Sequence, residues 1–105
     1  MTHETEFHRF ADATLDALFE QLESAYESGS LDDLELQEGI LTIKTAGGLT
    51  FVVSKHAPSG QIWLASPITG GLHFSYEPTS GEWQLADGSL LTERLTQELM
   101  QSGGL

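Results

Sequence analysis

The chain has 105 residues and a formal net charge of -12, with 16 acidic residues, 4 lysines and arginines, and no cysteine. This length predicts a single domain over residues 1–105, with one hydrophobic core. The composition excludes disulfides and cysteine-bound metal centres, and the charge disfavours binding to nucleic acid or to anionic membranes, so we expect cationic partners.

The first predicted element is an amphipathic helix over residues 4–27. Its apolar residues recur at spacings of three and four, the period of a helix with one buried face. These apolar residues are Phe7, Ala11, Leu15, Leu18, Leu22 and Ala25. The Ser-Gly-Ser sequence at 28–30 ends the helix.

Six short segments with strand character follow the helix. They cover residues 34–36, 40–45, 49–54, 61–66, 72–76 and 82–85. The turn sequences between them are short enough to join antiparallel neighbours, which predicts a six-stranded meander. After residues 87–88, Ser89 is positioned to cap a second helix, in which Leu91, Leu95 and Leu99 share one face.

Two amphipathic helices and one sheet predict an α+β fold, a two-layer α/β sandwich with both helices on one face of the antiparallel sheet. The other face of the sheet then meets solvent. In the segment 61–66, alternation places Ile62 and Leu64 on one side and Gln61 and Trp63 on the other. With the aliphatic pair in the core, Trp63 lies on the uncovered face, whereas Trp83 is expected in the core.

Acidic residues concentrate at the start of the chain. Residues 1–38 contain eleven acidic residues and one basic residue, a net charge of -10. At 100° per residue, five helix carboxylates fall within an arc of about 80°, nearly opposite the apolar stripe. They are Asp12, Asp16, Glu20, Glu23 and Glu27. Asp32, Asp33 and Glu35 follow on the first strand and are expected to extend this ridge, with almost no local bases to pair with.

Such a ridge has two interpretations. Like charges four residues apart destabilise a helix, so the arrangement favours a use such as metal or partner binding. Carboxylate oxygens suit hard metal ions, and exposed ones form shallow sites of low affinity. The alternative is a solvated helix face that only maintains solubility. His8 and Asp12, one turn apart, are a possible additional metal pair, or an incidental one.

Trp63 is a candidate docking residue. An outward indole beside Gln61, with Lys55 and His56 in the preceding turn, is typical of an interface anchor. The alternative is a tryptophan covered by a neighbouring loop. These observations predict a partner-binding site that contains Gln61, Trp63 and Lys55.

Residues 58–71, with the sequence PSGQIWLASPITGG, resemble the central strand-and-turn signature of the bacterial frataxins. The sequence EFHRFAD at 6–12 is similar to the helix opening of that family, and GILTI at 39–43 to its second strand. His73-Phe74 and Glu82-Trp83 resemble its last hairpin. The resemblance covers essentially the whole chain.

The resemblance implies a frataxin-like fold, weak and reversible binding of ferrous or ferric iron, and docking onto a cysteine desulfurase and an iron–sulfur scaffold protein. It carries Glu20, Glu23, Asp33 and Glu35 onto acidic positions of the family, with Asp16, Glu27 and Asp32 as neighbouring additions. It carries Gln61 and Trp63 onto the contact site of the sheet. Three residues depart from the family pattern: Phe19, Ser24 and Ser54.

The leading hypothesis is therefore a non-enzymatic, iron-binding regulatory protein of iron–sulfur cluster assembly. The alternative is a stand-alone iron chaperone or store with weak ferroxidase activity. The acidic residues face water instead of a bundle core, and no nucleophile or cofactor motif is visible, which disfavours an enzyme. We expect a monomer that iron could induce to oligomerise. Residues 1–6 lack the features of a targeting signal, so we expect the cytoplasm.

Overall fold

The computed structural model describes residues 2–103, and the side chains of residues 6–103. The elements in chain order are α1 (Thr2–Glu27), β1 (Leu31–Gln37), β2 (Ile40–Thr45), β3 (Thr50–His56), the short 3-10 helix η1 (Ala57–Ser59), β4 (Gln61–Ser66), β5 (Gly70–Glu77), β6 (Glu82–Gln84) and α2 (Leu91–Gln101). None of the helices in this part of the chain has the length and hydropathy to cross a membrane.

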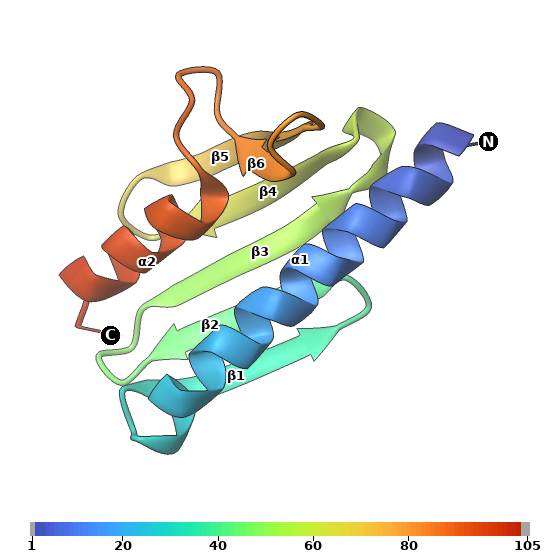
Figure 1. The fold of residues 1–105 in the computed structure, drawn as a ribbon. Helices are drawn as coiled ribbons and strands as arrows, with labels where there is room; N and C mark the ends of the chain where they lie inside the picture. The colour runs from blue at the N-terminus through green and yellow to red at the C-terminus, as the bar shows by residue number, and fades with distance from the viewer. Residues whose placement is uncertain (1, 104–105) are drawn as a thin grey trace.

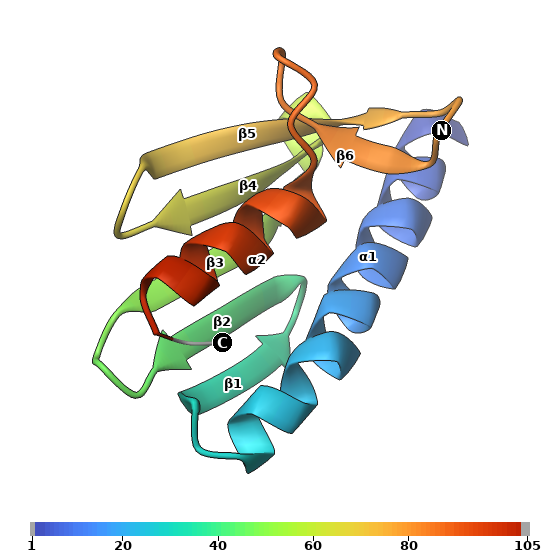
Figure 2. The ribbon, with the colours of Figure 1, turned by 60° about the vertical axis from the view of Figure 1, so that its left-hand side comes forward.

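The six strands form one antiparallel sheet in the order β1-β2-β3-β4-β5-β6. Figures 1 and 2 show α1 and α2 side by side on the same face of this sheet, while the other face carries no helix. The predicted two-layer α+β sandwich and its six-stranded meander are therefore confirmed. The sheet follows chain order because each connection is a short turn between neighbouring strands.

The turn between β1 and β2 shows how tightly these connections are built. Glu38 and Gly39 both have positive φ angles, 53° and 77°, as a two-residue hairpin turn requires. A Cβ atom on Gly39 would lie 2.5 Å from Cε of Lys55. The positive φ therefore favours glycine at position 39, and a larger residue would also require the end of the Lys55 side chain to move.

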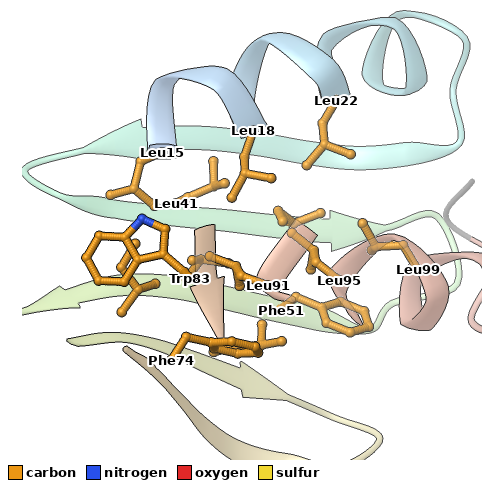
Figure 3. Close-up of a cluster of buried hydrophobic side chains, with 14 of the residues drawn as sticks. Leu15, Leu18, Leu22, Leu41, Phe51, Phe74, Trp83, Leu91, Leu95 and Leu99 are labelled. Carbon is orange, nitrogen blue, oxygen red and sulfur yellow. The ribbon is translucent and has the colours of Figure 1, made fainter. Parts of the chain in front are cut away.

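The core lies between the helices and the sheet. Figure 3 shows leucines of α1 and α2 in one buried cluster that also contains Phe51 and Phe74 of the sheet. The labelled leucines of the two helices are Leu15, Leu18, Leu22, Leu91, Leu95 and Leu99, each no more than 5% exposed. Trp83 is 3% exposed, and its indole Nε1 donates to Thr14 Oγ1 over 2.9 Å. The prediction that Trp83 belongs to the core is confirmed.

Two local predictions were wrong. Ser89 does not cap α2, because α2 begins after Leu90 without a side-chain cap. The segment first returns to the sheet edge, where Leu90 bridges to Gln84, and the Ser89 amide donates to Asp87 Oδ1 instead. Lys55 and His56 lie at the end of β3 and not in a turn, since strand pairing continues to the pair between His56 and Gln61.

Candidate functional site

The helix carboxylates form a ridge on the solvent side of α1. All of them are exposed, whereas the leucines of the same helix point into the core (Figure 3). The helix ridge consists of Asp12, Asp16, Glu20, Glu23 and Glu27. The helical period alone separates the two faces, because residues three and four apart share one side of a helix.

The acidic residues of β1 lie beside the helix but face a different direction. Leu34 and Leu36 pack against the core, so the alternating residues Asp33 and Glu35 point to the outer face of the sheet. Asp32 lies at the irregularity in the pairing of β1 with β2 and is also exposed. We call Asp32, Asp33 and Glu35 the strand acids. The strand β1 that carries them lies beside α1 at the same edge of the molecule (Figure 1), but Asp33 and Glu35 point to the other face of the sheet and do not continue the helix ridge.

Two carboxylates of these sets have a basic partner, which corrects the expectation that almost no local bases are available. Lys44 Nζ lies 3.9 Å from Asp32 Oδ2, and both side chains are largely exposed. Lys55 Nζ lies 2.8 Å from Asp12 Oδ1, and the Lys55 side chain is only 18% exposed. Lys44 comes from β2, the hairpin partner of β1, whereas Lys55 comes from β3, which is distant from α1 in sequence. Within residues 6–103, no lysine or arginine forms an ion pair with the remaining members of the two sets.

Lys55 is part of the helix-covered side of the molecule. It follows Phe51 and Val53 on the inward face of β3, whereas Trp63 lies on the outward face of β4. The structure therefore places Lys55 on the opposite face of the sheet from Trp63 and Gln61, and the assignment of the three residues to one partner-binding site stays a prediction. Its ammonium group also lies 3.0 Å from His8 Nδ1. This places a cation of the protein itself at the predicted metal pair of His8 and Asp12.

No preformed metal centre is present among the described side chains. Within residues 6–103, no three histidine, aspartate or glutamate side chains lie close enough together to hold one ion. The helix ridge and the strand acids instead offer single, hydrated carboxylates. Such ligands bind hard cations weakly, because water supplies most of the coordination.

Trp63 lies on the outer face of the sheet, stacked between two imidazoles. Ile62 and Leu64 on either side of it are 0% exposed, as the predicted alternation requires. The indole ring is 3.7 Å from the His56 ring and 4.2 Å from the His73 ring between centroids, each at an interplanar angle of 14°. The Trp63 Nε1 group donates to Gln61 Oε1 over 3.1 Å. Trp63 is half-buried, and neighbouring strands cover it, not a loop.

A buried carboxylate that sequence reasoning missed joins α2 to the turn after β4. Glu98 is 2% exposed. It accepts hydrogen bonds from Ser66 Oγ (2.5 Å), Thr69 Oγ1 (3.0 Å) and Arg94 Nε (2.7 Å). Burial alone would raise the pKa of Glu98. The hydrogen bonds from Ser66, Arg94 and Thr69 together lower it by more, so the pKa lies below its usual value. We interpret this cluster as structural, because its buried carboxylate ties α2 to the turn after β4, although Thr69 and part of the Arg94 side chain remain exposed.

The Frataxin-like domain family matches the chain over residues 1–105. The chain belongs to the frataxin family. The iron-sulfur cluster assembly protein CyaY of Pseudomonas aeruginosa is 39% identical to this frataxin, over 91% of this chain and 89% of that protein. The resemblance seen in the signature sequence at 58–71 is therefore confirmed at the level of the family.

Two yeast comparisons extend this relationship. The mitochondrial frataxin homolog of Saccharomyces cerevisiae is 38% identical over 89% of this chain, and the chain spans 54% of that protein's length. A crystal structure of trimeric yeast frataxin, complexed with ferrous iron, superposes with a TM-score of 0.77 at 37% identity. It covers 91% of this frataxin and 87% of the yeast chain, so the two share one fold.

Proposed function

We propose that this frataxin is a non-enzymatic adaptor of cytoplasmic iron–sulfur cluster assembly, which binds iron weakly and docks onto a cysteine desulfurase and a scaffold protein. The assignment to iron–sulfur cluster assembly is supported by the related CyaY protein of Pseudomonas aeruginosa, which is named for that process. The observation that supports the proposal is the division of the surface. Within residues 6–103, exposed carboxylates lie along α1 and β1, and most of them have no lysine or arginine partner, whereas Trp63 lies on the sheet face that carries no helix.

The helix ridge is suited to a basic protein surface. Its exposed carboxylates lie in a molecule with a net charge of -12. Opposite charge on a partner accelerates association and fixes orientation, and the effect weakens as salt screens it. We assign this ridge to the desulfurase, with Glu20 and Glu23 near its middle.

Reversing the charge of Glu20 and Glu23 to lysine is expected to weaken desulfurase binding about tenfold at low salt, because attraction becomes repulsion. The measurement is the dissociation constant by calorimetry at about 50 and about 300 mM salt, where the loss shrinks as screening increases. The matched comparison uses two single variants, Glu20→Lys on the ridge and Glu93→Lys on α2, where Glu93 is also an exposed helix glutamate. Equal effects of these two single variants would assign the attraction to net charge and reject the ridge as the contact.

The same carboxylates are the proposed iron ligands. Titration with ferrous iron is expected to broaden the amide resonances of residues 12–35 and to leave those of residues 61–66 sharp, because a paramagnetic ion broadens only nearby nuclei. Chelation should restore the spectrum, since exposed carboxylates hold the ion reversibly. Broadening centred on His8 alone would instead mean that the metal displaces Lys55 from its contact with Asp12.

The outer sheet face is assigned to the scaffold protein. Its central residues are Ile40, Ser54, Trp63 and His73, which lie in one register row across β2 to β5. Ile40 is 46% exposed and Trp63 is half-buried, with Ser54 between them in the row. An aromatic side chain and an exposed apolar side chain on the same uncovered face are typical of a docking surface.

A second candidate function is a stand-alone iron chaperone or store with weak ferroxidase activity. The yeast relative described as a trimer with ferrous iron favours it. The scattered ridge carboxylates disfavour an oxidation centre, which requires converging ligands in a protected site. Steady oxidation of ferrous iron by catalytic amounts of the monomer would establish this alternative over the adaptor.

A further inference from the structure

The indole of Trp63 is held on both faces by neighbouring strands. His56 of β3 stacks on one face and His73 of β5 on the other, with all three rings nearly parallel. Strand register makes this possible. His73 is the direct partner of Trp63, and His56 lies two residues beyond its other direct partner, Ser54. We call His56, Trp63 and His73 the Trp63 stack.

Hydrogen bonds fix the remaining freedom of the stack. Gln61 accepts from the indole N–H, and its own Nε2 donates to Ser75 Oγ over 3.2 Å. His56 Nδ1 lies 2.7 Å from Ser59 Oγ in η1. The indole is thus restrained on two faces and at its nitrogen, and rotation out of this position would break two stacking contacts and one hydrogen bond.

We infer that His56 and His73 are positioning residues for docking, which clamp Trp63 so that the partner meets the edge of a fixed indole and not its face. The inference rests on the proposed scaffold contact. A partner side chain that stacked flat on the indole would first have to displace an imidazole. The stack therefore suits a shallow apolar pocket that accepts the ring edges, and the clamp removes the cost of ordering the indole on binding.

The test compares two double variants. His56→Ala with His73→Ala removes both imidazoles and is expected to weaken scaffold binding about three- to tenfold, because an unclamped indole must be ordered on binding. His56→Phe with His73→Phe keeps two flat rings beside the indole, and its affinity is expected within about twofold of the parent. The readouts are the dissociation constant for the scaffold protein and the NMR order parameter of the Trp63 indole N–H.

The order parameter tests the positioning role directly. It should fall in the alanine variant and remain high in the phenylalanine variant, while the melting temperature confirms that both variants are folded. If Trp63→Ala weakens scaffold binding but His56→Ala with His73→Ala binds the scaffold protein like the parent, the clamp is overturned and the scaffold contact stands. Unchanged affinity in Trp63→Ala would overturn the scaffold contact itself and the clamp with it, so the two failures are distinguishable.

Discussion

Replacing Glu98 by alanine is expected to lower the free energy of unfolding by about 2–4 kcal/mol, because a buried carboxylate and its hydrogen bonds are lost together. Ser66, Thr69 and Arg94 would each lose their acceptor. In a domain of this size, the melting temperature should fall by about 10 °C or more. Chemical denaturation and a thermal melt at neutral pH measure both quantities.

Glu93→Ala is the control for this loss, since Glu93 lies on the same helix with an exposed side chain. It is expected to change stability by less than about 0.5 kcal/mol, as surface substitutions do. A loss of similar size in both variants would mean that α2 responds to any substitution, and that the buried cluster has no special part in holding the helix.

Glu98 is also expected to make the stability of the folded protein depend on pH. The pKa of Glu98 is lowered in the folded protein from its ordinary value of 4.5, chiefly by Ser66 and Arg94 against the opposing effect of burial. Its stabilisation is therefore fully present above about pH 4.5 and is lost as the pH falls through the lower folded-state pKa. The melting temperature of the parent should fall more steeply below this pH than that of Glu98→Gln. Parallel curves would contradict the assignment.

The comparison with Glu98→Gln removes the contribution of every other titratable group of the chain. These groups are the same in the two proteins, so the difference between their melting curves isolates Glu98.

The features that depend on local periodicity were predictable from sequence. A helix repeats every 3.6 residues, so the positions of Leu15, Leu18 and Leu22 define the buried face of α1 and place the ridge opposite. A strand alternates every two residues, so Ile62 and Leu64 placed Trp63 on the outer face. Both periods are properties of a single segment and require no knowledge of its neighbours.

The features that depend on strand register were not predictable. The Trp63 stack requires His56 and His73 to arrive from two other strands, and a shift of one residue would turn either imidazole to the opposite face. The ion pair of Lys55 with Asp12 likewise joins β3 to α1. Glu98 left a local clue, because it follows Leu91 by seven residues and so falls on the buried stripe of α2.

Replacing Trp63 by alanine is expected to weaken scaffold binding by about thirtyfold or more, because truncation of a central aromatic anchor costs about 2 kcal/mol or more. Iron binding by residues 12–35 should be unchanged, since no member of the helix ridge contacts the indole. The matched control is Tyr26→Ala, which removes an aromatic side chain that is 48% exposed on α1. Calorimetry with the scaffold protein and with ferrous iron measures the two activities separately.

The pattern of losses separates the candidate functions. An adaptor loses scaffold binding in Trp63→Ala and keeps it in Tyr26→Ala, because only the first residue lies on the uncovered sheet face. A stand-alone chaperone depends on its carboxylates and is indifferent to both changes. Equal scaffold affinities for Trp63→Ala, Tyr26→Ala and the parent would therefore reject docking through this face, and would leave the carboxylates as the working surface of the molecule.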